Sequence, residues 1–355
     1  MKNIWVSLLS VSLALFQYVE AAEESPSGSK CKKIQVRKEW RALSWGEKKA
    51  WIDAVNCLNR RPASGNLKPP VNTSEYGQFN FIPPVSPGAS YSSELVYTHM
   101  NLNPLIHFTG LFLPWHRLYV HEFTDALRKQ CGYKGVAPYW AWENDAADFE
   151  NSSIWDPDPV VGLGGFGDPN DDYIVKTGAL NLTLTYPVTH KLRRKYQPFP
   201  FAGSGLPGFD DIQANKTFTP AEVQALLAQP TGNFTAFQYY MEKFDGMHGL
   251  VHGIVGGDLA GRCPRGSDSS NCPFEGAPTF SSNEPLFHLH HGNIDRLWWL
   301  WQEKGNGNKY AFHGGSVQNL SAVPQFPNGV APWLNKSDIM PTAGMCTNLV
   351  SRARS

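Results

Sequence analysis

The chain has 355 residues, enough for one large catalytic domain or two small ones, and its 31 basic residues balance 31 acidic ones. This neutrality gives no indication of a nucleic acid or an anionic membrane surface as a partner. Aromatic residues are abundant, with 12 Trp, 13 Tyr and 20 Phe, which fits either a well-packed core or a pocket lined with rings.

The first residues have the pattern of a secretory signal peptide. Lys2 supplies a short basic region, residues 4–16 form an apolar run, and residues 19–21 offer small side chains for cleavage. The run is too short to span a membrane, and no second stretch approaches about 20 apolar residues. We therefore expect residues 1–21 to be removed and the protein to be secreted, without a membrane anchor.

Six cysteines and seven glycosylation sequons follow this segment. An even number of cysteines without a CxxC pair favours three disulfides over a zinc or redox site. Cys263 and Cys272 bracket a short loop, and Cys31 with Cys346 could clasp the two ends of the domain. The sequons begin at Asn72, Asn151, Asn181, Asn215, Asn233, Asn319 and Asn335. Together these features predict a glycosylated extracellular protein.

Two helices are predicted in the first half of the chain. The segment 44–58 begins with a capping box formed by Ser44 and Glu47. Residues 59–90 are rich in Pro, Gly and Asn and predict a long loop. A second helix is expected over about 114–130, with Pro in its first turn and a Cys-Gly pair at its end.

The second half alternates irregular and helical segments. Residues 144–210 carry many Gly, Pro and Asp and are expected to be mostly irregular. Residues 219–222 have the pattern of another capping box, and one long helix is expected over about 235–255. A last helix is expected to open at 282–285 and to run to Gly305. Strand signals are short and few, so the sequence predicts a mainly α fold whose core is a small helical bundle.

The histidines fall in two clusters. His99, His107 and His116 lie within 18 residues, and His248 and His252 are four apart, so both of the latter rings project from one helix face. A single histidine on an apolar helix is more often a hydrogen-bonded core residue than a ligand. A buried pair needs a partner for each ring, and two clusters that can each supply three ligands favour a metal site.

A further ligand for the second cluster is available in the sequence FHLHHGNIDRLW at residues 287–298. Here His290 and His291 are adjacent, and adjacent helix positions differ by about 100° in direction. Only one of the two is therefore expected to face a metal, and the sequence alone does not say which. His288, three residues before His291, has no assigned role. The other histidines are expected to be structural or exposed: His121, His190 and His313.

This donor set favours copper. Zinc hydrolases usually add a carboxylate or pair their helix histidines as HExxH, whereas Gly249, Leu250 and Val251 separate His248 from His252. Non-haem iron prefers two histidines with one carboxylate. Imidazoles without a thiolate or an obligatory carboxylate suit copper. Two such sets facing each other would make a dinuclear site.

These motifs resemble those of the tyrosinase, catechol oxidase and haemocyanin family of type-3 dicopper proteins, in particular its short secreted fungal polyphenol oxidases. The similarity covers roughly residues 36–301 and rests on FLPWHR, the HxxxH pair and HHxxxDRLW, which together rarely occur elsewhere. It implies a four-helix bundle holding two copper ions, within one catalytic domain over 22–355 that ends in a loop-rich extension, 302–355. By this resemblance, the first copper is held by His99, His107 and His116, and the second by His248, His252 and His291.

Three further residues have candidate roles around the second copper, two of them, Phe287 and Gly249, by this resemblance. Phe287 matches a ring that overhangs this copper and could gate the site, with core packing as its alternative role. Asp295 is a candidate orienting group for a ligand, or a salt-bridge partner for Arg37 or Arg41. Gly249 stands where strong monophenol hydroxylases often carry Asn, so we expect it to tune the activity toward catechol oxidation.

Two further departures from the family are visible. No cysteine lies between residues 57 and 131, so the thioether that many relatives form with their second ligand is expected to be absent. The chain ends soon after His291, which leaves no room for the shielding domain of longer relatives. The active site is therefore expected to be open.

The expected reaction is oxidation of o-diphenols to o-quinones with reduction of O2 to water; ortho-hydroxylation of small monophenols is left open. The expected partners are O2 and small phenols, and the sequence indicates no oligomeric state. Two alternatives are haemocyanin-like O2 binding without turnover and a secreted zinc hydrolase that uses HxxxH.

Overall fold

The computed structural model describes residues 35–64, 89–268, 272, 278–313 and 347–348. All of them belong to the unit Cys31–Ser355. The predicted signal peptide and both cysteines of the predicted Cys31–Cys346 pair lie outside the described residues. Within the described part, no helix is long and apolar enough to cross a membrane.

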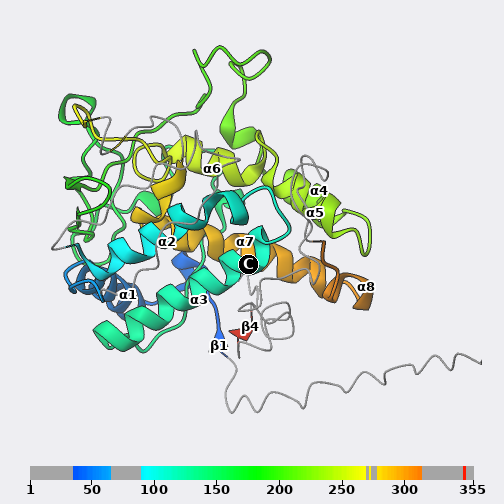
Figure 1. Ribbon diagram of the computed structural model, residues 1–355, viewed down its shortest axis with the longest axis horizontal. Helices are drawn as coiled ribbons and strands as arrows, with labels where there is room; N and C mark the ends of the chain where they lie inside the picture. The colour runs from blue at the N-terminus through cyan, green and yellow to red at the C-terminus, as the bar shows by residue number, and fades with distance from the viewer. Residues whose placement is uncertain (1–34, 65–88, 269–271, 273–277, 314–346, 349–355) are drawn as a thin grey trace, which may run out of the picture. The chain divides into compact units, whose positions relative to one another are not determined.

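Four helices make up the centre of this unit (Figure 1), and they carry the histidine clusters. They are α2 (Tyr91–Ile106), α3 (Phe112–Cys131), α6 (Met247–Val255) and α7 (Leu286–Gln302). α3 packs against both α2 and α7. The predicted four-helix core of a mainly α fold is thus confirmed.

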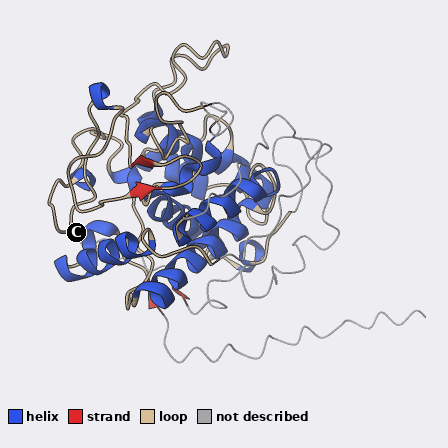
Figure 2. Cartoon of the chain, turned by 60° about the vertical axis from the view of Figure 1, so that its left-hand side comes forward, coloured by secondary structure: helices blue, strands red, loops and turns tan. Residues whose placement is uncertain are grey.

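The other elements pack around this core. The remaining helices are α1 (Trp45–Leu58), α4 (Pro220–Leu227), α5 (Phe234–Glu242) and α8 (Asn306–Lys309). The 3-10 turns are Trp40–Ala42, Trp142–Asn144, Ser153–Trp155, Pro169–Asp171, Ala214–Lys216 and Pro278–Asn283. β1 (Gln35–Val36) pairs in parallel with β4 (Thr347–Asn348), and β2 (Thr183–Leu184) pairs antiparallel with β3 (His190–Lys191). Figure 2 shows these few strands among long loops, as the sequence predicted.

The predicted starts and stops of the early helices are largely confirmed. At α1, the Ser44 hydroxyl accepts from the Glu47 N–H, and the Ser44 N–H donates to Glu47 Oε2 at 2.8 Å. α3 ends at Gly132, whose φ of 69° lies in the left-handed region that glycine tolerates. A disulfide between Cys57 and Cys131 joins the last turns of α1 and α3, which pack against each other.

The prediction of one long helix over 235–255 is wrong. The chain leaves the helical conformation at Lys243, where φ is −51° and ψ is 153°, so α5 and α6 are separate helices. At Gly246 a Cβ would lie 2.7 Å from the Lys243 carbonyl oxygen, so the turn requires glycine there. Phe244 consequently lies in the turn and is 47% exposed, and His248 falls in the first turn of α6.

α2 was not predicted, although it carries His99. Its sequence contains several Ser, Thr and Asn residues of low helix propensity, together with a proline in its last turn. Ser90 caps its start by accepting from the Ser93 N–H, and Val96, Tyr97 and Met100 are buried. Tertiary packing rather than propensity therefore stabilises this helix.

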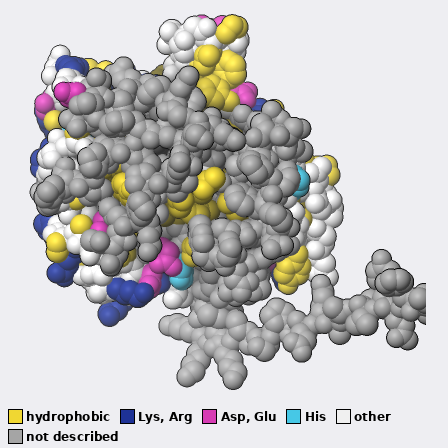
Figure 3. Space-filling model, viewed as in Figure 1, with side chains coloured by type: hydrophobic (Ala, Val, Ile, Leu, Met, Phe, Trp, Pro, Cys, Tyr) yellow, Lys and Arg dark blue, Asp and Glu magenta, His cyan; other side chains and the backbone are white. Residues whose placement is uncertain are grey.

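Most of the aromatic excess fills the core. Six tryptophans are fully buried: Trp40, Trp51, Trp140, Trp142, Trp298 and Trp301. The loop 198–212 differs from the core, because the apolar side chains of Phe199 and Leu206 there are more than one-third exposed. This loop projects above α6 in Figure 1, and Figure 3 shows hydrophobic side chains gathered at the same place.

The sequons differ in accessibility. Asn151, Asn181 and Asn233 are exposed. Asn215 is buried, and its amide nitrogen donates to the Ala146 carbonyl oxygen at 2.9 Å. The sequons at Asn72, Asn319 and Asn335 lie outside the described residues.

Candidate metal centre

The two predicted histidine clusters each come together in space. The first group contains His99 from α2, His107 at the end of α2, and His116 from α3. The second group contains His248 and His252 from α6 with His290 and His291 from α7. Within each group, one ring nitrogen of every member lies within 4.8 Å of the others.

Several of these rings are oriented by backbone carbonyls. Nδ1 of His116 lies 2.8 Å from the Phe112 carbonyl oxygen, and Nδ1 of His107 lies 3.2 Å from that of Asn103. Nδ1 of His252 lies 2.7 Å from the Leu259 carbonyl oxygen. A carbonyl only accepts, so Nδ1 carries the proton in each case and the Nε2 lone pair is left for a metal ion.

The remaining ring nitrogens fit a metal ion because they are buried without a hydrogen-bond partner among the described residues. This holds for Nε2 of His116, His248 and His252, and for both nitrogens of His290 and His291. Burial lowers the pKa of His248 and His291 well below the usual histidine value, and that of His252 to about 4. The imidazoles are therefore neutral at physiological pH, which is the form that binds metal.

The two groups lie against each other. The His116 and His291 rings stack with centroids 4.2 Å apart, and the His107 and His248 rings stack with centroids 6.1 Å apart. Phe287 is fully buried between the groups, with its centroid 5.1 Å from His99 and 4.3 Å from His291. This arrangement can hold two metal ions side by side.

Which of His290 and His291 faces a metal stays a prediction, and the second group includes both of them. Both offer a ring nitrogen to it, because side-chain torsions can swing two imidazoles toward one point even from adjacent helix positions. His290 lies 4.8 Å from His252 between ring centroids, whereas His291 faces His116 of the first group. No carboxylate belongs to either group of described residues, which agrees with copper over zinc or non-haem iron.

Asp295 joins the helices that carry the two groups. Its carboxylate accepts from Arg37 Nη1 at 2.7 Å, as predicted, and from Arg117 Nε, which was not predicted. Arg41 pairs instead with Glu39 and Asp145, so that alternative is wrong. Because Arg117 follows His116 on α3, the Arg117–Asp295 pair locks α3 to α7 beside the histidines.

His288 lies outside both groups. Its ring stacks on Phe123 with centroids 3.4 Å apart, and Tyr119 lies 5.7 Å away. His190 has a structural setting, since its Nε2 lies 2.9 Å from Asp258 Oδ1. These two histidines therefore pack or pair within the protein rather than join the metal groups.

Glu242 is a residue near the site that the sequence reasoning missed. It is buried, its Oε1 accepts from the Phe108 N–H at 2.7 Å, and its Oε2 accepts from Gln238 Nε2 at 2.9 Å. Burial raises its pKa well above the usual range for glutamate. Phe108 follows His107 and has a positive φ of 56°, so Glu242 holds the strained residue next to a candidate ligand. No local pattern marks Glu242, since its neighbours at i−4 and i−3 on the helix are Gln238 and Tyr239.

Comparison with known proteins gives the site its family. A family model described as the common central domain of tyrosinase matches residues 89–304. The chain belongs to the tyrosinase family. This is a family of oxidases with dinuclear copper that act on phenols with O2, and the two histidine groups are where this member can bind its copper ions.

Individual relatives agree with this tyrosinase assignment. A tyrosinase-like protein of Diaporthe leptostromiformis is 28% identical over 345 residues, covering 90% of this chain and 76% of its own length. N-acetyl-6-hydroxytryptophan oxidase of Emericella nidulans is 29% identical over 348 residues, covering 84% of this chain and 83% of its own. A solved variant of polyphenol oxidase from Thermothelomyces thermophila, 22% identical, superposes with a TM-score of 0.64 over 90% of each chain and shows the shared fold.

Proposed function

We propose that this tyrosinase family member is a secreted catechol oxidase that converts o-diphenols to o-quinones. In this reaction two o-diphenols give up four electrons and four protons, and one O2 becomes two water molecules. The observation that supports it is the pair of adjacent groups of buried, neutral imidazoles without a carboxylate. Secretion is supported by the two disulfides, Cys57–Cys131 and Cys263–Cys272.

The proposed ligands are the six histidines of the sequence motifs. His99, His107 and His116 would hold the first copper, and His248, His252 and His291 the second. His291 is preferred to His290 because its ring stacks on His116 and so lies between the two groups, whereas the His290 ring contacts His248 and His252 and, among the described residues, no ring of the first group. Bound copper would supply O2 activation and accept electrons from the phenol.

The protein itself contributes orientation and exclusion of water. Carbonyl groups fix the His116 and His252 rings with Nε2 directed to the metal side. Phe112 packs against both His116 and His248, with centroids 4.8 and 4.7 Å away. These apolar rings keep the histidines neutral and keep water from their lone pairs.

Phe287 is proposed as the ring that overhangs the second copper and limits where a phenol ring can bind. Its contacts with His99, His252 and His291 support this position, and its complete burial supports a wall more than a freely moving gate. Phe287→Ala should raise KM for catechol several-fold while both coppers are retained. An unchanged KM would mean that Phe287 only packs in the core and does not limit phenol binding.

The function is tested by metal analysis and oxygen uptake on one purified sample. We expect two coppers per chain and rapid oxygen uptake with catechol, compared side by side with tyrosol, guaiacol and o-aminophenol. Zinc in place of copper would contradict the proposal and favour a hydrolase. Reversible O2 binding with no turnover of catechol would favour a carrier.

A further inference from the structure

The candidate ligands differ in what holds their rings. His116 and His107 use carbonyls four residues earlier on their own helices, from Phe112 and Asn103. His252 uses the carbonyl of Leu259, which lies beyond the end of α6 at Val255. The orientation of His252 therefore depends on the turn formed by residues 256–262, which we call the return turn.

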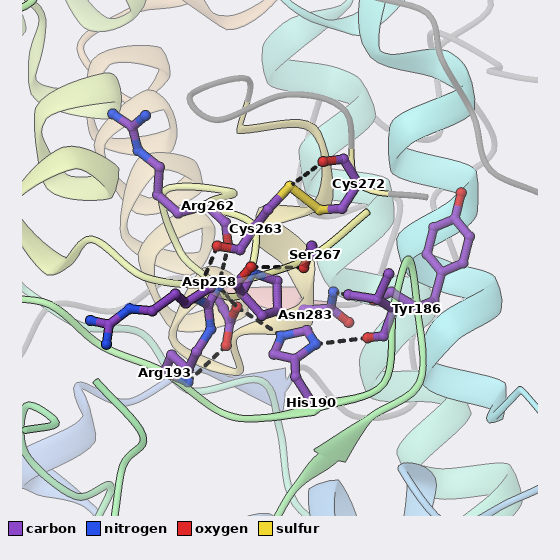
Figure 4. The surroundings of a disulfide bond; sticks show 12 residues. Tyr186, His190, Arg193, Asp258, Arg262, Cys263, Ser267, Cys272 and Asn283 are labelled. Carbon is purple, nitrogen blue, oxygen red and sulfur yellow. Dashed lines mark hydrogen bonds and ion pairs between the residues drawn. A yellow bond between two sulfur atoms is a disulfide. The ribbon is translucent and has the colours of Figure 1, made fainter. Parts of the chain in front are cut away.

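The return turn is fixed by the buried side chain of Asp258. Asp258 is fully buried, and its Oδ1 accepts from His190 Nε2 at 2.9 Å and from Arg193 Nη2 at 3.1 Å. Its Oδ2 accepts from the Arg193 N–H at 2.7 Å, and its own N–H donates to the Arg193 carbonyl oxygen at 3.0 Å. Figure 4 shows the carboxylate held between His190 and Arg193. Asp258, the residue next to Leu259, is thus held by hydrogen bonds from both its side chain and its backbone.

The same arginine holds the far end of the return turn. Arg193 Nη1 donates to the Cys263 carbonyl oxygen at 3.1 Å, and Nη2 donates to that of Arg262. Cys263 is in turn tied to Cys272 by a disulfide (Figure 4). Arg193 therefore anchors both Asp258 and the residues at which the turn leaves the site.

Backbone packing leaves the return turn little freedom at its start. Gly256 and Gly257 have positive φ values of 61° and 50°. A Cβ at Gly257 would lie 2.3 Å from the Arg193 carbonyl oxygen, so the two backbones are in direct contact. The Lys195 N–H also donates to the Val255 carbonyl oxygen at 3.0 Å. The segment 190–195 is therefore the support on which the turn rests.

We propose that Asp258 is a positioning residue for His252. By fixing the return turn, it fixes the Leu259 carbonyl, which determines that Nδ1 of His252 carries the proton and where Nε2 points. This inference rests on the proposed function, since it takes His252 as a ligand of the second copper. Replacing a group that orients a metal ligand typically weakens metal binding by about 10–100-fold.

Asp258→Asn tests this with a change of charge at nearly constant size. Asp172→Asn is the matched control, because Asp172 accepts from the same Arg193 guanidinium at 3.2 Å but is not part of the return turn. We expect Asp258→Asn to weaken binding of one of the two coppers by about 10–100-fold in competition with a chelator. Asp172→Asn should bind both coppers as the unaltered protein does.

A second variant covers the case in which Asp258→Asn folds poorly. His190→Gln keeps a donor for the carboxylate but loses the ring, and we expect a smaller loss at the same copper with the thermal unfolding temperature of the metal-free protein nearly unchanged. The absorption that paired coppers give in the near ultraviolet after addition of hydrogen peroxide should fall in parallel with the loss of that copper.

Two results would overturn the positioning role. One is wild-type affinity for both coppers in Asp258→Asn. The other is an equal loss at both coppers that follows a loss of metal-free stability, which would indicate a purely structural network. Failure of the proposed function is a separate result, because then the unaltered protein itself would not bind two coppers or oxidise catechol.

Discussion

The two histidine groups are built by different means. In the first group, His107 and His116 are oriented by carbonyls of their own helices, so most of the geometry is local in sequence. In the second group, His252 depends on a turn beyond its helix and on Asp258, while α7 supplies two adjacent histidines. Two groups with the same kind of ligand can therefore be oriented by local structure in one half of a site and by long-range contacts in the other.

Removing a ligand should give the largest effect and test the membership of each group. His252→Ala and His291→Ala should each lose one copper and reduce quinone formation by more than about 100-fold, beyond the loss typical of outer partners. His290→Ala should keep both coppers and most of the activity. Copper content and catechol oxidation are measured on each variant. If His290→Ala loses one copper and its activity while His291→Ala keeps both, His290 is the ligand and His291 is not.

Weakening the Arg117–Asp295 contact should destabilise the packing of α3 on α7, the helices that carry ligands of the two groups. Asp295→Asn leaves Arg37 and Arg117 buried with a weakened partner, and removing one member of a buried ion pair typically costs about 3–5 kcal/mol. Denaturant unfolding of the metal-free protein measures this cost. Asp53→Asn is the control, since Asp53 forms an exposed pair with Lys49 and should change stability little.

A change at Glu242 should act on the first group alone. Glu242→Leu leaves the Phe108 N–H without its acceptor and loosens the segment at His107. We expect first-copper affinity to fall by about 10-fold, at the low end for partners of ligands. Glu222→Gln is the control, because Glu222 also accepts from a neutral donor, the Tyr240 hydroxyl, away from the histidines. Equal losses of affinity for both coppers in Glu242→Leu would contradict an effect confined to the first group.

Acid should destabilise the metal-free protein through these histidines. Their folded pKa values are lowered by burial, so the unfolded chain binds more protons below its own histidine pKa of about 6.5. The stability is fully present above that pH and is lost as pH falls through the window toward the folded pKa, about 4 for His252. His290→Phe should reduce the slope of unfolding free energy against pH by up to about 1.4 kcal/mol per pH unit. An unchanged slope would mean that folding does not lower the pKa of His290.

The smallest effect is expected at Gly249, which follows His248 of the second group on α6. A Cβ there would lie 3.3 Å from the Phe244 carbonyl oxygen, so Gly249→Asn fits after a small backbone shift. The added amide beside His248 should raise the ratio of monophenol hydroxylation to diphenol oxidation by a few-fold, measured on tyrosol and catechol. Gly249→Ala is the control for the backbone shift without the amide. If both variants have the same ratio of hydroxylation to oxidation, the side chain at position 249 does not tune the activity.

Sequence reasoning succeeded where the deciding contacts are local. The capping box at Ser44, the end of α3 at Gly132 and the His248–His252 pair on α6 all depend on residues a few positions apart. The capping box expected at Thr219 is only half formed, because the Glu222 carboxylate accepts from Tyr240 on α5 instead of closing it. The Tyr240 contact joins α4 to α5, and the local sequence pattern does not predict it.

The parts that were missed depend on contacts distant in the chain. The helix breaks at Lys243 and brings Gly246 close to the Lys243 carbonyl, a contact that hydrophobic periodicity does not reveal. The pairing of Asp295 with Arg117, and of Asp258 with His190, joins segments that only the folded chain brings together. The clusters of the site were therefore predictable, whereas the contacts that orient its rings were not.

Asn215 has a consequence for how the protein is made. In the secretory route that we propose, oligosaccharide transfer acts on chains that are still unfolded, yet this asparagine ends buried against Ala146. A sugar attached there would block the last step of packing, so only molecules that escape modification at this position can mature. Glycopeptide mass spectrometry of the secreted enzyme should find Asn215 bare, while Asn151 and Asn181 remain open to modification.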